Sequence, residues 1–153
     1  MTKKYWMLLA LALVLGGISL YLNTDWFARD DIHIMFRSMP PRPGFFRRRQ
    51  ADTAAVNPVL FGLDRKLKLT QIEVVVLADI KTNKYPHALW HLQSDSNSVP
   101  IKDFFYGDYI QGMHPAFRGT VPEALEPGVK YRLLVEAGSR KAQIDFEPAP
   151  RTP

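Results

Sequence analysis

The chain has 153 residues, no cysteine, 46% hydrophobic residues and a formal net charge of +5 at pH 7. Without cysteine it has no disulfides, lipid-modified cysteine, thiolate-bound zinc, iron–sulfur clusters, c-type haem attachment or thiol nucleophile. Residues 1–55 carry eight Lys/Arg against four Asp, whereas residues 56–153 carry twelve Lys/Arg against eleven Asp/Glu. The positive excess therefore lies outside the C-terminal two thirds, and the sequence predicts no nucleic-acid partner.

The first 22 residues contain the most apolar stretch of the chain. Residues 5–22 have no charged side chain and follow two lysines. A helix of that length covers about 27 Å, close to the hydrocarbon thickness of a bilayer. The sequence therefore predicts a transmembrane helix, a signal-anchor at residues 1–22. Trp26 and Phe27 follow it, as expected of aromatic rings at a membrane–water interface.

Charges on either side of this segment predict its orientation. Two lysines precede it, whereas one arginine and three aspartates lie within residues 25–31. This asymmetry predicts a single-pass protein of a bacterial inner membrane, with a cytoplasmic N-terminus and a periplasmic domain. A cleaved signal peptide is the alternative, with Gly17 and Ser19 before a cleavage site at Leu20. We favour the uncleaved anchor because the apolar run continues through that site.

Two small residues, Ala12 and Gly16, lie four positions apart in the same segment. This spacing lets a second helix approach closely, so they are candidate partner-contact residues. The alternative is that glycine and alanine are simply common in membrane helices.

Residues 23–57 are predicted to form a tether. Residues 32–36 alternate apolar and other side chains like a short extended arm, and three prolines at 40, 41 and 43 favour extension. An aromatic and basic cluster follows the prolines: Phe45, Phe46, Arg47, Arg48 and Arg49. We predict that this cluster contacts a membrane partner or anionic headgroups, with a solvated linker as the alternative.

Residues 58–148 show a two-residue periodicity interrupted by turn signals, and residues 149–153 form a tail. Strands are predicted at 67–80, 87–94, 99–107, 117–121, 129–137 and 141–147, with no helix among them. The predicted fold class is mainly β, one antiparallel β-sandwich after the N-terminal helix.

The segment LEPGVKYRLLVEA, residues 125–137, has a Pro-Gly turn at Pro127 and Gly128 and a tyrosine at Tyr131. It resembles the turn and penultimate strand of fibronectin type III domains, which are immunoglobulin-like sandwiches. In that family the tyrosine bonds its hydroxyl to backbone a few residues upstream. The resemblance implies a fibronectin III/Ig-like fold and no enzymatic function. Trp90, on an earlier strand, suits the core aromatic of such a sandwich.

Three histidines are the candidate metal ligands: His87, His91 and His114. On a strand, His87 and His91 would lie about 13 Å apart, too far to share an ion. The sequence therefore predicts no metal and no cofactor, with a metal-handling protein kept as an alternative.

Asp103, Asp108 and His114 could form an acid–base group, but no serine or cysteine in a nucleophile context accompanies them. We therefore predict no catalytic residue. Strand alternation can bury only half of the aromatic run in residues 104–109, so Phe105 and Tyr109 are predicted to contact a partner. A second core layer is the alternative.

These features together predict a non-enzymatic, membrane-anchored accessory subunit. Its sandwich and tether would contact other subunits of a larger membrane complex, and a bacterial respiratory or photosynthetic assembly is one such host. The alternatives are a free-standing periplasmic module that binds a ligand or polymer and a metal-handling protein.

Overall fold

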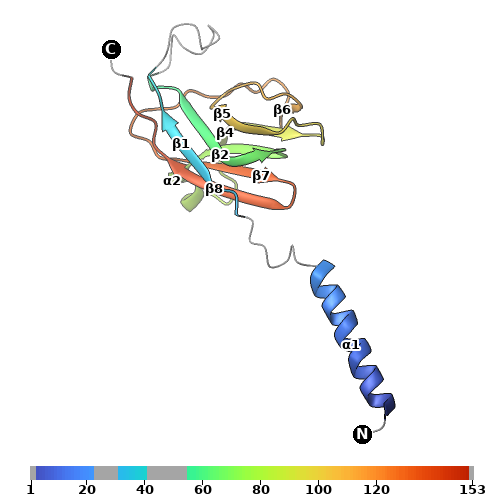
Figure 1. Cartoon of the computed structure of the whole chain (residues 1–153). Helices are drawn as coiled ribbons and strands as arrows, with labels where there is room; N and C mark the ends of the chain where they lie inside the picture. The colour runs from blue at the N-terminus through green and yellow to red at the C-terminus, as the bar shows by residue number, and fades with distance from the viewer. Residues whose placement is uncertain (1–2, 23–30, 41–54, 152–153) are drawn as a thin grey trace. The chain divides into compact units, whose positions relative to one another are not determined.

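A computed structural model describes residues 3–22, 31–40 and 55–151 of the chain (Figure 1). The chain divides into two units, residues 1–30 and residues 31–153. Within the described residues the first unit holds one helix, and the second holds eight strands and a short helix.

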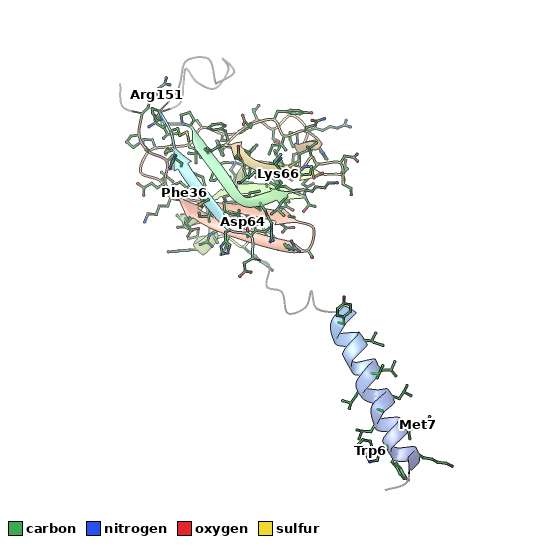
Figure 2. The ribbon with its side chains drawn as sticks, in the orientation of Figure 1. Trp6, Met7, Phe36, Asp64, Lys66 and Arg151 are labelled. Carbon is green, nitrogen blue, oxygen red and sulfur yellow. The ribbon has the colours of Figure 1, made fainter. Side chains whose placement is uncertain are left out.

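Helix α1 (Lys3–Leu22) has apolar side chains on all its sides. Trp6 and Met7 project from it (Figure 2), and those of its large apolar side chains that the structure describes are 50–79% exposed. No helix among the described residues is long and apolar enough to cross a membrane. The predicted single-pass transmembrane helix is therefore wrong.

The second unit is mainly β, with two antiparallel sheets, as the sequence predicts. The smaller sheet has the order β1-β2-β5 and the larger the order β6-β4-β3-β7-β8 (Figure 1). The strands are β1 (Ile34–Ser38), β2 (Val59–Leu67), β3 (Gln71–Val76), β4 (Ala88–Ser94), β5 (Ile101–Phe105), β6 (Met113–Pro115), β7 (Tyr131–Ala137) and β8 (Arg140–Phe146).

Strand β1 corrects the predicted boundary of the domain at residue 58. It lies within the stretch predicted as a tether, yet it pairs with β2 from Ile34 opposite Leu63 to Ser38 opposite Val59. Ile32, just before it, is 6% exposed and belongs to the core. The alternation read as an extended arm is therefore that of a strand in the smaller sheet.

Three other predictions within the domain also differ from the structure. The predicted strand at 67–80 is divided, because β3 ends at Val76 and helix α2 (Leu77–Thr82) follows directly. Strands β2 and β6 have no counterpart in the prediction. Residues 117–121 are not a strand but contain a turn, in which the N–H of Thr120 donates to the carbonyl of Phe117 at 3.3 Å and Gly119 has a φ of +81°.

Aromatic side chains connect the two sheets across the core. Phe61 of β2 is fully buried, and its ring centroid lies 4.9 Å from that of Phe146 in the other sheet and 5.5 Å from that of Phe104. Trp90, 4% exposed, extends the cluster from the larger sheet toward Phe104 at 6.1 Å. These contacts bury large apolar surfaces, which is the main favourable contribution to folding.

Tyr131 begins β7 and is 2% exposed. The backbone N–H of Glu126 donates a hydrogen bond of 2.9 Å to its hydroxyl, across the turn at Pro127 and Gly128. Gly128 has a φ of +77°, a conformation that favours glycine. Burial raises the pKa of the Tyr131 phenol. The tyrosine therefore holds the turn against the first residue of β7, which is the geometry that the sequence predicts for this segment.

Tyr131→Phe is expected to lower the free energy of unfolding by about 1–3 kcal/mol, because the Glu126 N–H loses a partly buried acceptor. Urea unfolding followed by tryptophan fluorescence measures this change. Tyr109→Phe is the control, since Tyr109 is 82% exposed and should show no loss. Equal stability of the two variants would contradict a structural role for the Tyr131 hydroxyl.

Candidate functional site

The first half of β4 has a loop fixed along its edge. Beyond β6, the N–H of Ala116 donates to the carbonyl of His91 at 3.1 Å, and the N–H of Glu123 donates to the carbonyl of Leu89 at 3.0 Å. Residues 116–123, which we call the 116–123 loop, are therefore attached to β4 at both ends. Thr120 Oγ1 donates to the carbonyl of Phe117 at 2.7 Å and holds the turn inside the loop.

A groove of about 430 Å³ lies between this loop and β4. Residues 87–92 line one side, and Pro115, Phe117 and residues 119–123 line the other. Phe117 is 70% exposed and Val121 is 79% exposed. The groove is therefore mostly apolar, and two of its lining side chains are open to solvent.

Glu123 holds one end of the groove together. Its Oε1 lies 2.6 Å from Nε2 of His87, and its carbonyl accepts a hydrogen bond of 2.8 Å from the hydroxyl of Tyr106. Burial, followed by the nearby Glu123 carboxylate, raises the pKa of Tyr106 far above its ordinary value. Tyr106 therefore stays a neutral donor, and it fixes the loop to the segment that follows β5.

His91 lies at the other end of the groove, on the outer face of the larger sheet opposite Glu73. Its Nε2 is buried and has no hydrogen-bond partner among the described residues. The ring of Phe117 stands nearly perpendicular to it, with 6.4 Å between centroids. A buried polar atom without a partner is rare in proteins, so this nitrogen is a candidate contact for a bound group.

The three predicted histidines do not converge. His87 pairs with Glu123, His91 faces Phe117, and Nδ1 of His114 lies 3.9 Å from a carboxylate oxygen of Asp95. The described residues contain no group of three or more His, Asp or Glu side chains that could hold a metal ion. The arrangement therefore gives the metal-handling alternative no support.

The three residues considered as an acid–base group, Asp103, Asp108 and His114, also do not come together. Asp103 pairs with Gly62 in the smaller sheet, whereas Asp108 accepts a hydrogen bond of 3.2 Å from the N–H of Phe105. Burial raises the pKa of the Asp108 carboxyl, and the Phe105 bond partly opposes that shift. Among the described residues, no hydrogen bond or ion pair joins either aspartate to His114.

The predicted contact residues have different positions. Ala12 and Gly16 are exposed on α1. Phe105 is half-buried in β5, while Tyr109 is 82% exposed on the loop before β6. The others lie outside the described residues: Trp26, Phe27, Phe45, Phe46, Arg47, Arg48 and Arg49.

Sequence reasoning missed Phe117, Val121 and Glu123. The alternation of Phe117, Gly119 and Val121 suggested a strand, and only the positive φ of Gly119 shows that the chain turns there. The pairing of Glu123 with His87 joins residues 36 positions apart, for which the sequence carries no signal.

No protein-family model matches this sequence, and no match was found among curated proteins or solved structures. The chain is therefore defined by its own features, a two-sheet antiparallel β unit with a surface groove and a separate apolar helix. The resemblance of residues 125–137 to fibronectin type III domains stays a prediction.

Proposed function

We propose that this chain is a non-enzymatic accessory protein whose β unit binds a partner protein of a larger complex at the groove between β4 and the 116–123 loop. The observation that carries the proposal is the exposure of Phe117 and Val121 on a loop that is fixed at both ends. Exposed apolar residues grouped at a concave surface are typical of protein interfaces.

The fixed loop makes these side chains suitable for binding. Ordering a free loop on association costs conformational free energy, which reduces affinity. Here hydrogen bonds from Ala116, Glu123 and Tyr106 hold the loop before any partner arrives. A partner side chain that enters the groove would therefore bury apolar area with little further ordering.

The strand order supports the view that this unit belongs among immunoglobulin-like sandwiches, which commonly serve as binding modules. In such domains strands A, B and E share one sheet and strands C, F and G share the other. The order β1-β2-β5 corresponds to A-B-E, and β3-β7-β8 corresponds to C-F-G, with β4 and β6 added beside C. Tyr131 then lies at the start of strand F, the usual position of the tyrosine corner.

Helix α1 supports an accessory role independently. Its described large apolar side chains are exposed. A helix that is apolar on every side is unfavourable in water and normally lies buried against other apolar groups. A partner that covers α1 would give the chain a second attachment to its complex.

Affinity purification of the full chain from its native cells tests the proposal, with co-purifying proteins quantified by mass spectrometry. The double variant Phe117→Ser/Val121→Ser should recover about tenfold less of the specific partner than the parent chain. Met35→Ser is the matched control, because Met35 is 65% exposed but lies on β1 in the other sheet. Equal recovery by the double variant and the parent would contradict the proposal.

The alternative function, a module that binds a ligand or polymer, is favoured by one observation. His91, whose buried Nε2 has no hydrogen-bond partner among the described residues, lines a groove whose volume falls within the usual range for small-ligand sites. Under this alternative, His91→Phe should abolish ligand binding. Under the partner-binding proposal, the same variant should retain the partner because Phe117 and Val121 are unchanged.

A further inference from the structure

We propose that the outer edge of β8 is a self-association surface, through which two copies of this chain pair antiparallel about a two-fold axis at Gln143. The two larger sheets would then form one continuous sheet across the dimer. This inference is independent of the proposed function, because β8 is at the opposite side of its sheet from the groove beside β4.

Strand β8 is the longest edge strand of the β unit. It has seven residues, whereas the other edge strands β6, β1 and β5 have three, five and five. Its seven pairs with β7 run without a register shift. No described strand pairs with its other side, so it presents a regular row of backbone donors and acceptors that a second strand can pair with.

Charges beside this edge are already arranged in two opposite pairs. Arg132 donates two hydrogen bonds to the Asp145 carboxylate, at 2.6 and 2.9 Å, and Nζ of Lys141 lies 2.6 Å from Oε1 of Glu136. The hydrogen bond from Arg132 lowers the pKa of Asp145. Arg132 and Glu136 alternate with the buried positions of β7, and Asp145 and Lys141 are their partners on β8. All four therefore lie on the outer face of the larger sheet.

An antiparallel pair about Gln143 places Lys141 of each chain opposite Asp145 of the partner subunit. Across four strands the outer face would then read Arg132, Asp145, Lys141 of the partner subunit and Glu136 of the partner subunit. This row alternates positive and negative charge, and the two-fold axis repeats it. Opposite charges directly across an antiparallel pair are favourable.

Other registers lose this complementarity. An axis at Lys141 or at Asp145 places two like charges opposite each other. An axis at Ala142 or at Ile144 leaves Lys141 or Asp145 opposite Gln143. Registers with the axis between two residues would place each side chain opposite one from the other face of the sheet. The charge pattern therefore selects the axis at Gln143.

The inner face of β8 agrees with the same axis. Ala142 and Ile144 are only partly buried at the margin of the core. In the proposed register Ala142 lies opposite Ile144 of the partner subunit, and Ile144 lies opposite Ala142 of the partner subunit. Pairing would therefore remove apolar surface from water on the inner face and pair charges on the outer face.

Cysteine cross-linking tests the register directly, because the chain has no cysteine of its own. Residues directly opposite each other have Cβ atoms about 4.5–5.5 Å apart, so Gln143→Cys in the full chain should form a disulfide-linked dimer on oxidation. Lys141→Cys is the control. Its two copies would lie about 13 Å apart along the strands and should stay unlinked. Efficient linking through residue 141, or none through residue 143, would overturn the proposal.

Charge exchange tests the energetics, with dimer formation measured by analytical ultracentrifugation in a mild non-ionic detergent that disperses α1. Lys141→Asp and Asp145→Lys should each weaken dimerisation about tenfold, because each replaces two attractive pairs by two repulsive ones. An equimolar mixture of the two variants should restore the dimer, since opposite charges then face each other again. A dimer unaffected by these changes would form elsewhere, and the proposal would be wrong.

Gln143→Lys is a further test, because the charge exchanges at residues 141 and 145 also break the pairs with Glu136 and Arg132 and could thereby disturb folding. Gln143 takes part in neither of the two charge pairs described above, and two lysines would face each other at the axis. The variant should dimerise more weakly than the parent chain, with an unchanged melting temperature. A Gln143→Lys variant that dimerises as tightly as the parent chain, or a parent chain that stays monomeric at every concentration, would overturn the proposal.

Discussion

Phe61→Ala is expected to lower the free energy of unfolding by about 3–5 kcal/mol, the usual range for removing a buried phenylalanine. The side chain is fully buried on the central strand of the smaller sheet. Its ring contacts Phe104 in its own sheet and stands edge-on to Phe146 of the larger sheet. The variant would therefore lose packing within one sheet and between the two sheets.

Phe36→Ala is the matched control for this prediction. Phe36 also contacts Phe146, with 6.0 Å between ring centroids, but it is 40% exposed on the edge strand β1. Less apolar area is lost from the core, so the expected decrease is about 1–2 kcal/mol. Urea unfolding of both variants gives the comparison. Similar losses would mean that the cavity at residue 61 collapses, which would contradict a rigid contact between the sheets.

The sequence predicted best those strands whose alternation is regular. In β7, Tyr131, Leu133 and Val135 are buried, and the residues between them are half-exposed. The pattern works here because one face of the strand meets the core and the other meets solvent. The same logic predicted β4 and β8, although it placed the start of β4 and both ends of β8 one residue away from the observed bounds.

The sequence failed where the pattern is broken or where tertiary contacts decide. Strand β2 contains Gly62 and the charged residues 64–66, so its second half does not alternate as a buried strand should. Helix α2 has no buried residue and no side-chain cap. The sequence therefore contains neither a periodic apolar face nor a capping motif that would predict this helix. The position of β1 depends on pairing with β2, a contact between segments that residues 41–54 separate.

The sequence singled out three residues that line the groove, His87, Trp90 and His91, but none of them as a partner contact, and the predicted contact Tyr109 does not line it. Exposed Tyr109 follows from the density of aromatics in residues 104–109, which strand alternation cannot bury completely. The groove could not be predicted, because it depends on two backbone bonds between the 116–123 loop and β4. Such bonds involve groups that every residue carries, so the sequence does not mark them.

Gly112→Ala is expected to destabilise the fold by more than about 3 kcal/mol, because strained backbone and a close contact coincide there. Gly112 has a φ of +81°, and a Cβ atom would lie 2.1 Å from the carbonyl oxygen of Asn97 and 2.8 Å from Cα of Ser98. Both neighbours are backbone atoms. The loop that precedes β6 would have to move away from residues 97–98. That movement would also disturb the neighbouring hydrogen bond, in which the N–H of Val99 donates to the carbonyl of Gln111.

Gly119→Ala separates the two causes. Gly119 has the same φ of +81°, but nothing lies within 4 Å of the position its Cβ would take. That variant should lose only about 1–2 kcal/mol, the cost of left-handed backbone for a residue with a Cβ. Urea unfolding of both variants measures the difference. A chain with Gly112→Ala that fails to fold agrees with the prediction, whereas equal losses for the two variants would show that residues 97–98 give way and that their contact with Gly112 is not needed.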